Sequence, residues 1–356
     1  MIPIDRFRDI SAMIDRATET RVSPAVAIEV GRPEGALWRH AAGRLTYDDD
    51  APAATLETIF DLASLTKVVA TTSLVMRAVE QGQLELSAQV SAYLPAWQGH
   101  DRDSATLLDL LEHASGLTAH LPFFRDHRGR AEFEAAICSL PLEYSPRSQS
   151  IYSDLGFILL GFILSDVVAT PLDRQWAELS EQLELGDLRY RPPRTWRPRI
   201  APTELDPWRG RLLQGEVHDE NGWALDGVAG HTGLFGTVAA VSRFARVMLA
   251  TMTRSTPLGS PDTARRFFTR TTVSGSSRAL GWDTMLPTSS CGDRLSPSAI
   301  GHTGFTGTSL WIDPDAGFYV VLLTNRVYPT RANEAILDLR PAIHNAVAQR
   351  LASELA

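Results

Sequence analysis

Residues 60–80 read FDLASLTKVVATTSLVMRAVE and hold the only lysine of this 356-residue chain, Lys67. Lysine and arginine together number 34, so every other basic residue is an arginine. Arginine stays charged at ordinary pH, whereas a lysine amine in apolar surroundings can lose its proton near neutral pH. A single lysine in such a chain indicates a role that arginine cannot fill, with codon bias as the plain alternative.

The apolar residues after Ser64 predict a helix over 65–80 that stops before Gly82. Ser64 and Lys67 then share one helix face, about one turn apart. Serine is a good nucleophile only once a base removes its proton, and apolar neighbours are expected to lower the pKa of Lys67 so that its amine is that base. The helix N-terminus also offers N–H groups to a developing oxyanion. Taken alone, Ser-x-x-Lys is also a common helix cap followed by a surface lysine.

Composition narrows the class of protein. Hydrophobic residues make up 44% and charged residues 21%, which is typical of a globular chain. The net charge of −8 gives no basic balance, so neither nucleic acid nor an anionic membrane is expected as a partner. Cys138 and Cys291 are too few for a disulfide framework or a cysteine-rich metal site and are expected to be free thiols.

The N-terminal segment carries early acidic residues and lacks the apolar core of a secretory signal peptide. The longest apolar run, 155–164, is shorter than the roughly 20 residues that a membrane-spanning helix needs. The sequence therefore predicts a cytoplasmic protein without a membrane span.

Strand and helix patterns are segregated along the chain. Short β-branched runs occur only toward its two ends, and the final stretch 331–355 is helical in pattern, with Pro341 expected to interrupt it early. The middle is helix-like. We predict an α/β (α+β) fold in which 1–75 and 225–356 form a discontinuous sheet domain and 76–224 a mostly helical inserted domain. The strands are expected at 25–30, 37–41, 308–312 and 318–324, and the helices of the middle at 65–80, 106–113, 132–138, 154–168 and 172–183.

Two further motifs follow Ser64. Tyr152-Ser153-Asp154 lies 88 residues downstream, and a His-Thr-Gly triplet follows 150 residues later at 302–304, with a second copy at 231–233. With these motifs the chain resembles the serine β-lactamase, DD-peptidase and esterase superfamily, and within it the branch of class C β-lactamases, DD-carboxypeptidases and family VIII-type esterases. In that branch the second motif is Tyr-x-Asn and the third is Lys/His-Thr-Gly on a strand beside the active site.

The resemblance implies the serine β-lactamase/DD-peptidase-like fold, an antiparallel sheet flanked by helices, and a hydrolase that forms an acyl-enzyme on Ser64. Tyr152, with Lys67, would move the proton to the leaving group, and the N–H groups of Ser64 and Phe305 would hold the oxyanion. No metal or cofactor is implied, and the substrate would be a small molecule. The other residues that the resemblance places at the site are His302, Thr303, Gly304 and Asp154.

The triplet at 302–304 is taken as the third motif because a strand pair follows it. The triplet at 231–233 precedes a helix-like segment, 234–249, so His231 is expected in a rim loop. His302 stands where the branch often has lysine. It would hold a substrate carboxylate only when protonated, so affinity for anionic substrates should fall above about pH 6.5.

Asp154 departs from the asparagine of the second motif. An ionised aspartate only accepts hydrogen bonds, whereas asparagine also donates them. Asp154 is therefore expected to pair with Lys67 and keep it charged. It cannot donate to a substrate amide carbonyl, which weakens the expected recognition of β-lactams.

Three classes of function stay open. A β-lactamase-like hydrolase or esterase comes first, a D-amino-acid peptidase or DD-carboxypeptidase second, and a penicillin-binding protein that is acylated without turnover third. The histidines at 113, 120 and 127 suggest either a metal site or, more simply, loop residues. The His218-Asp219-Glu220 cluster lacks zinc spacing and is interpreted as structural or as part of the site rim.

Overall fold

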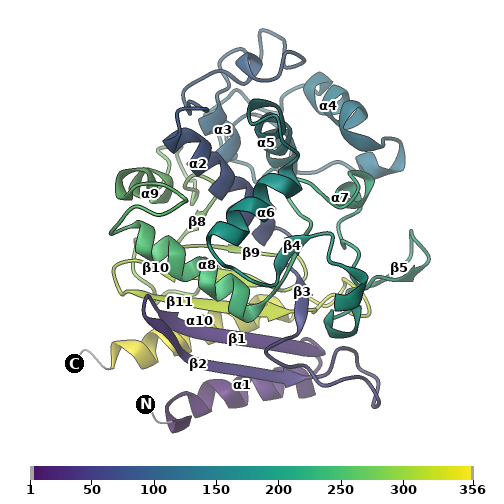
Figure 1. Cartoon of the computed structure of the whole chain (residues 1–356), viewed down its shortest axis with the longest axis vertical. Coiled ribbons are helices and arrows are strands. Elements are labelled where there is room, and N and C mark those ends of the chain that lie inside the picture. Colours follow the sequence, from purple (N-terminus) through teal and green to yellow (C-terminus); the bar gives the residue numbers. More distant parts are fainter. Residues whose placement is uncertain (1–3, 354–356) are drawn as a thin grey trace.

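Six antiparallel strands form the main sheet, in the spatial order β2-β1-β11-β10-β9-β8. The computed structural model of the chain describes residues 4–353. Figure 1 shows the two ends of the chain side by side in this sheet, β1 and β2 in purple and β11 in yellow. The strands are β1 (Ala25–Arg32), β2 (Gly35–Gly43), β8 (Asp283–Thr284), β9 (Ile300–Thr303), β10 (Ser309–Asp313) and β11 (Phe318–Thr324).

The inner strands β1, β10 and β11 are buried on both faces of the sheet. Val26, Ile28 and Leu322 pack on one face against α1 (Arg8–Glu19) and α10 (Ile336–Ala352). Ala27, Val321 and Leu323 belong to the core on the other face, which α8 (Val238–Thr251) covers. Burial of both faces explains why β11 reads FYVVLLT without polar alternation. The predicted strands at both ends of the chain are confirmed.

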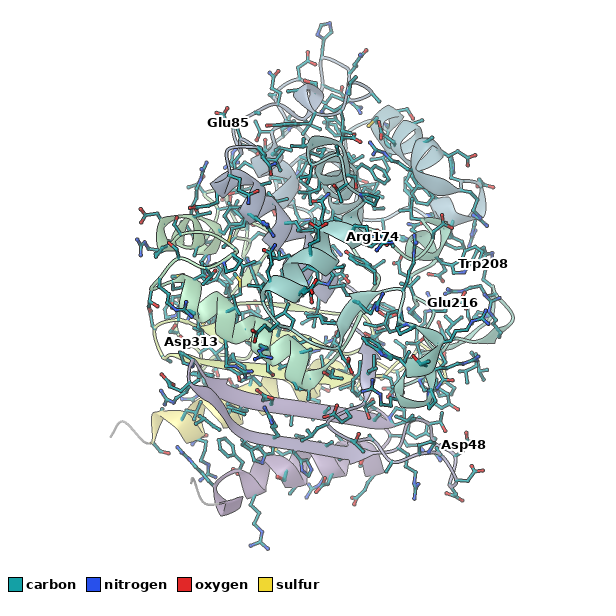
Figure 2. All side chains as sticks on the ribbon, viewed as in Figure 1. Asp48, Glu85, Arg174, Trp208, Glu216 and Asp313 are labelled. Atoms are coloured by element: carbon teal, nitrogen blue, oxygen red, sulfur yellow. The ribbon has the colours of Figure 1, made fainter. Side chains whose placement is uncertain are left out.

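A helical layer lies on the α8 side of the sheet (Figure 1), and side chains fill the space between them (Figure 2). Its centre is α5 (Asp154–Val167), whose residues from Leu155 to Leu164 are all buried. The all-apolar run therefore belongs to a core helix. The other helices are α2 (Ser73–Glu80), α3 (Leu107–Leu111), α4 (Gly129–Ser139), α6 (Leu172–Gln182), α7 (Glu220–Ala224) and α9 (Pro261–Phe268).

A second sheet of three short strands connects the two regions. β7 (Leu234–Thr237) pairs with both β3 (Ile59–Asp61) and β4 (Leu188–Tyr190). A separate hairpin is formed by β5 (Leu205–Asp206) and β6 (Arg211–Leu212). Single helical turns complete the chain: η1 (Ile4–Phe7), the π-helical η2 (Lys67–Thr72), η3 (Val90–Ala92), η4 (Phe123–Arg125) and η5 (Arg194–Arg199).

The predicted helix over 65–80 is confirmed, with α-helical residues 65 and 66, the π-helical turn η2 and α2 following one another without a break. Two local predictions are wrong. Residues 234–237 form β7 rather than helix, because β3 and β4 supply hydrogen-bonding partners on both sides that the sequence does not reveal. Pro341 lies within α10 without ending it. Proline removes only one helical N–H, whose partner would be the carbonyl of Leu337, a residue with an exposed side chain.

All strands of the main sheet lie outside residues 76–224, and the division into two domains stays a prediction. Among residues 4–353, no single helix is long and apolar enough to cross a membrane. α5 and α6 together meet the length and composition criteria only as a pair bent by 80°, and α5 is core. The cellular compartment also stays a prediction.

Candidate active site

Ser64 lies on the turn between β3 and η2, where the main chain is strained. Ala63, immediately before it, has a left-handed φ of 46°, which is uncommon for a residue with a side chain. The N–H of Ala63 donates to Asp61 Oδ1 at 2.8 Å, which holds the turn. This geometry presents a half-buried Ser64 at the start of the helical segment.

Lys67 is fully buried, and its amine contacts three oxygen atoms. Nζ lies 2.9 Å from Ser64 Oγ, 2.7 Å from Asp154 Oδ1 and 3.2 Å from the carbonyl of His231. Three acceptors match the three N–H groups of an ammonium. Burial alone would lower the pKa of Lys67, but Asp154 and Tyr152 outweigh it and raise that pKa. The expectation of a neutral amine base is therefore wrong, and the expected pairing with Asp154 is confirmed.

Tyr152 packs among Lys67 and two imidazoles. Its ring centre lies 4.8 Å from Lys67 Nζ, 4.7 Å from the His113 ring and 5.7 Å from the His302 ring. Burial raises the pKa of the Tyr152 phenol, while Lys67 and hydrogen bonding to Lys67 and Ser64 oppose that rise. The resting side chain is a neutral phenol beside a charged amine.

Asp154 is the first residue of α5, and Lys67 and His120 face its carboxylate. Oδ1 pairs with Lys67, and Oδ2 lies 3.6 Å from His120 Nδ1. Burial alone would raise the pKa of Asp154, but Lys67 and His120 outweigh it and hold that pKa well below its usual range. Asp154 is therefore an ionised acceptor beside the nucleophile.

The third motif continues from the end of β9 into a turn, 304–308, that contacts the nucleophile segment. Thr306 Oγ1 donates to the carbonyl of Asp61 at 2.7 Å, and Thr308 Oγ1 donates to that of Leu62 at 3.1 Å. A Cβ at Gly304 would lie 2.5 Å from the carbonyl oxygen of Leu62, so only glycine permits this approach. β8 pairs with β9 only at residues 300 and 301, which leaves the last two residues of β9 at an open edge.

Two main-chain N–H groups meet at the site, that of Ser64 and that of Phe305 in the 304–308 turn, as the resemblance implies. Within residues 4–353, neither the N–H of Ser64 nor that of Phe305 donates a hydrogen bond. Arg340 of α10 donates to the carbonyls of Gly304 and Thr308 at 2.7 and 2.9 Å, and Arg326 donates to that of Phe305 at 2.9 Å. The two arginines fix the turn and so the direction of the Phe305 N–H.

His302 is buried and neutral. Its Nδ1 lies 2.8 Å from the carbonyl of Thr303 and donates to it, which leaves Nε2 unprotonated. Burial, then the charges of Lys67 and Arg278, hold the pKa of His302 well below its usual range. Asp154 opposes this shift more weakly. These effects favour the neutral imidazole in the free protein, and binding of a substrate carboxylate by a protonated His302 stays a prediction.

Two cavities meet at Ser64 and Tyr152. The larger, of about 490 Å³, is lined on one side by Arg278, Arg326 and Arg340. The smaller, of about 260 Å³, is lined by the third-motif neighbour Phe305, by three acidic side chains and by His120, His218, Thr232 and Arg331. Those acidic side chains are Asp154, Asp219 and Glu220. Ser64 therefore lies between a cavity that three arginines line and a cavity that three acidic side chains line.

Sequence reasoning missed Arg278. Its guanidinium lies 5.0 Å from the centre of the Tyr152 ring, and its nearest acid, Asp283, is 4.0 Å away. No local motif marks it, because it comes from an irregular segment that reaches the site only through the fold. His120 was named, but its position beside Asp154 could not be predicted because Gly116 and Pro122 disrupt any regular pattern around it.

His231 and His113 are structural neighbours of the site. His231 is buried rather than part of a rim loop, because its carbonyl binds Lys67 and its Nε2 pairs with Asp219 Oδ1 at 3.0 Å. His113 is buried too, and its Nδ1 accepts the N–H of Ser153 at 3.0 Å. In the described part of the chain, no three histidine, cysteine, aspartate or glutamate side chains converge as a metal site would require.

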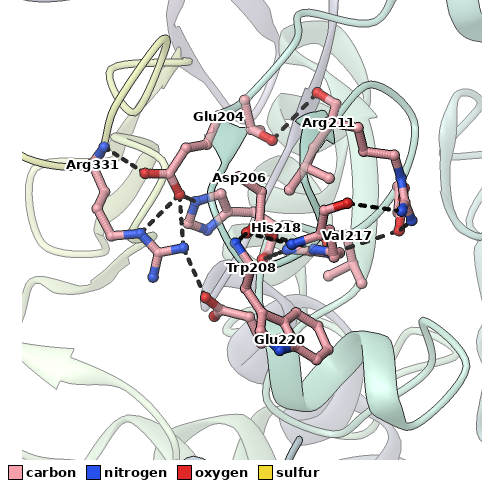
Figure 3. A network of polar contacts seen from close by, with 12 residues as sticks. Glu204, Asp206, Trp208, Arg211, Val217, His218, Glu220 and Arg331 are labelled. Carbon is pink, nitrogen blue, oxygen red and sulfur yellow. Dashed lines mark hydrogen bonds and ion pairs between the residues drawn. The ribbon is translucent and has the colours of Figure 1, made fainter. Parts of the chain in front are cut away.

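The His218-Asp219-Glu220 cluster belongs to a polar network beside the small cavity (Figure 3). Glu204 pairs with His218 Nε2 at 2.9 Å and with Arg331 at 2.7 Å, and Arg331 pairs with Glu220 at 2.8 Å. The His218 ring stacks on Phe305 at 5.6 Å. Asp219 caps α7 through the N–H of Gly222. The network supports the wall of the cavity next to Phe305.

Comparisons with known proteins agree with this geometry. The sequence profile of the Beta-lactamase family matches residues 10–342. An N-acetylmuramyl-L-alanine amidase of Bacillus subtilis is 34% identical over 301 residues, 76% of this chain and 68% of the relative. A Salmonella gallinarum protein, whose name gives D-alanyl-D-alanine carboxypeptidase as a provisional activity, is 32% identical over 316 residues, 80% of this chain and 73% of the relative.

Solved structures share the fold. A penicillin-binding protein homologue from Caulobacter crescentus superimposes with a TM-score of 0.76 at 18% identity, covering 97% of this chain and 98% of its own. EstCE1, described as a hydrolase with promiscuous acyltransferase activity, superimposes with a TM-score of 0.72 at 20% identity, covering 95% of this chain and 98% of its own. The predicted serine β-lactamase/DD-peptidase-like fold is confirmed.

Proposed function

This chain belongs to the β-lactamase family, and from that premise we propose that it is a serine hydrolase with Ser64 as nucleophile, acting on an amide or ester whose substrate carries a free carboxylate. One observation carries the proposal. Ser64 Oγ accepts a hydrogen bond from the fully buried Lys67 Nζ at 2.9 Å, at the point where two cavities meet.

The charge on Lys67 decides the route of the proton. A charged amine donates to Ser64 Oγ and cannot take its proton. Tyr152 lines both cavities together with Ser64, so its phenol oxygen is our candidate to take the Ser64 proton while its own proton moves to the leaving group. The positive charge of Lys67, 4.8 Å from the ring centre, stabilises the phenolate character that develops in this transfer.

The carbonyl oxygen of the substrate receives the N–H groups of Ser64 and Phe305. Both donors are preorganised, because Ala63 fixes the first and the tied 304–308 turn fixes the second. Such donors stabilise the tetrahedral intermediate without reorganisation during the reaction.

Arg278 is our candidate for binding the substrate carboxylate. Among the three arginines of the larger cavity, Arg326 and Arg340 already donate to main-chain carbonyls. Arg278 has only Asp283 at 4.0 Å as an acidic partner, and it lines the same cavity as Ser64. A guanidinium can bind a carboxylate through two parallel hydrogen bonds.

The names of the relatives favour peptidoglycan fragments as the substrate class. One relative is named for an N-acetylmuramyl-L-alanine amide bond and another for a D-alanyl-D-alanine bond, and both kinds of fragment end in a carboxylate. We therefore place amide hydrolysis of such fragments first. Ester hydrolysis is the second candidate, because the exposed Phe305 and Leu337 give the larger cavity an apolar side. β-Lactam hydrolysis comes last, because Asp154 cannot donate to a lactam-side amide.

The test is a substrate panel with two variants. Wild-type protein, Ser64→Ala and Arg278→Gln are incubated with muramyl-L-alanyl-D-isoglutamine, acetyl-lysyl-D-alanyl-D-alanine, p-nitrophenyl butyrate and nitrocefin. We expect amide cleavage by the wild type, none by Ser64→Ala, and a KM raised at least tenfold with a similar kcat in Arg278→Gln. Full activity in Ser64→Ala contradicts the proposal, and an unchanged KM in Arg278→Gln contradicts the assignment of the carboxylate site.

A further inference from the structure

An acyl-enzyme on Ser64 is released only when a base activates water, and the groups closest to Ser64 are unsuited to that task. Lys67 is held as an ammonium by Asp154, and Tyr152 rests as a neutral phenol. Lys67 cannot accept a proton from water, and Tyr152 can accept one only while it passes its own proton to Ser64 Oγ. A separate base for the water would come from another side chain of the two cavities.

His120 lies in the right place and in the right pairing. It lines the smaller cavity together with Ser64 and Tyr152, and its side chain is 45% exposed, so water reaches it. Its Nδ1 is 3.6 Å from Asp154 Oδ2, which leaves Nε2 as the second ring nitrogen. An acid that holds Nδ1 orients the imidazole and favours protonation there, as in Ser-His-Asp sites. Contacts of this kind are often long before substrate binds.

The loop that carries His120 is fixed to the second motif. Asp154 N–H donates to the carbonyl of Ala119 at 2.9 Å, and Ser153 Oγ donates to that of Thr118 at 2.7 Å. Residues 118–120 therefore move with the start of α5. The position of the imidazole relative to the nucleophile is set by these two bonds rather than by a free loop.

Thr232 supplies a second polar group for a water molecule in the same cavity. Its Oγ1 is buried and has no hydrogen-bond partner within the described residues. An ordered water needs two or more polar partners and sufficient room. A cavity of about 260 Å³ lined by His120 and the Thr232 hydroxyl meets both needs.

Other imidazoles near Ser64 are poorer bases. His218 has its Nε2 bound to Glu204 and its ring stacked on Phe305, and it is buried. His302 and His113 are fully covered, and burial holds the pKa of each well below its usual range, which makes them weak bases. His120 alone among these four is open to solvent and held by a carboxylate.

We propose that His120, oriented by Asp154, is the general base that activates the water for deacylation of Ser64. The proposal rests on the proposed function. The water oxygen attacks the acyl carbon while its proton passes to His120 Nε2. The bond from the acyl carbon to Ser64 Oγ then breaks, and Ser64 Oγ takes a proton from Tyr152 beside the charged Lys67. Tyr152 regains a proton from the carboxylic acid that forms, and the product leaves as a carboxylate. His120 afterwards returns its proton to solvent.

The groups that face His120 set its pH dependence. Asp154 comes from α5, Asp219 and Glu220 from the start of α7, and His218 and Arg331 line the same cavity. Asp154 is the main cause that raises the pKa of His120, against burial. The neutral imidazole is the base. The deacylation rate should therefore increase with pH, with a midpoint above about pH 6.5, and then level off.

The experiment measures deacylation separately from acylation. Wild-type protein, His120→Gln and His100→Gln are acylated with p-nitrophenyl butyrate at pH 5, desalted and followed by intact mass from pH 5 to 9. His100 is the matched control, because its Nδ1 also lies 3.6 Å from an aspartate, Asp103, but it is fully exposed. We expect His120→Gln to lose its acyl group about 100-fold more slowly without the rise with pH, and His100→Gln to match the wild type.

A second variant separates catalysis from folding. His120→Ala should accumulate the acyl-enzyme and be rescued by added imidazole, which a merely structural role would not permit. Deacylation of His120→Gln at the wild-type rate, or failure of the variant to accumulate acyl-enzyme, overturns the proposal. A fluorophosphonate that leaves Ser64 unlabelled in all variants instead contradicts the proposed function.

Discussion

At the scale of single residues, the charge of Lys67 separates this chain from the simplest account of a Ser-x-x-Lys site. The apolar neighbours of Lys67 do bury it, as the sequence predicts. The expected loss of its proton fails because Asp154, 87 residues downstream, lies 2.7 Å away. A local pattern can predict burial and shared helix faces, but the pKa of a buried amine depends on partners that only the tertiary fold supplies.

Asp154 also predicts an acid-dependent loss of stability. Its pKa is depressed in the folded protein, so its contribution to the free energy of unfolding is present above about pH 4 and is lost as pH falls below that value. We expect chemical denaturation to show a steeper loss of stability between pH 5 and 3 in the wild type than in Asp154→Asn. Parallel curves for the two proteins would contradict an ionised, paired Asp154.

The same substitution tests whether Asp154 limits the recognition of β-lactams. Asparagine both donates and accepts hydrogen bonds, so Asp154→Asn supplies the missing donor to a lactam-side carbonyl. We expect at least tenfold faster acylation by nitrocefin in Asp154→Asn, measured as absorbance change under single turnover. A slower reaction would show that the Lys67 pairing matters more than the donor.

Breaking the ion pair from the other side should cost stability. Lys67→Met removes the ammonium 2.7 Å from the Asp154 carboxylate and leaves His120 at 3.6 Å, and breaking a buried pair typically costs about 3–5 kcal/mol. Urea denaturation at pH 7 measures this loss. The double variant Lys67→Met with Asp154→Asn should recover part of it, and no recovery would argue against the pair as the source.

At the scale of elements, the 304–308 turn positions the oxyanion donor. A Cβ at Gly304 would lie 2.1 Å from Thr308 Oγ1 and 2.5 Å from the carbonyl oxygen of Leu62, so Gly304→Ala must push the turn away from Ser64. We expect kcat to fall about 100-fold with little change in KM, as for loss of one oxyanion donor. Steady-state kinetics on whichever panel substrate is turned over measures this.

Gly156→Ala is the matched control for that substitution. Gly156 lies in α5, where an added Cβ would meet only ordinary contacts at 3.6 Å or more. Helix propensity favours alanine there by about 1 kcal/mol, so activity should be retained. An equal loss of kcat in both variants would show a general effect of backbone substitution rather than displacement of the turn.

Elements were predictable from the sequence where the pattern was local. Strands β1, β2, β10 and β11 of the main sheet and the helix at 154–168 follow from apolar runs bounded by turn residues. β7 was not predictable, because its four residues adopt strand geometry only through pairing with β3 and β4. Arg278 and His120 were not predictable as site residues for the same reason, since each lies on irregular chain and reaches Ser64 through the packing of other elements.

At the scale of the whole molecule, the two ends of the chain build the platform on which the site rests. β1 pairs with β11, and α1 packs with α10 beneath them (Figure 1). The same α10 carries Arg340, which donates a hydrogen bond to the carbonyl of Gly304 in the 304–308 turn. One helix therefore contacts both the terminal layer and the oxyanion turn.

Ile343 tests the terminal layer alone. It is fully buried in α10 against the sheet, and truncation of such a side chain typically costs about 2–5 kcal/mol. We expect Ile343→Ala to lower Tm by several degrees while kcat at low temperature stays within about twofold of the wild type. A large loss of kcat below the transition would show that the turn moves with the helix.

Locating a covalent adduct is the most direct test that Ser64 is the nucleophile. Wild-type protein and Ser64→Ala are treated with a fluorophosphonate, digested and analysed by tandem mass spectrometry. We expect a single adduct on the peptide that contains Ser64, and none on Ser64→Ala. An adduct on another residue, or equal labelling of both proteins, would contradict it.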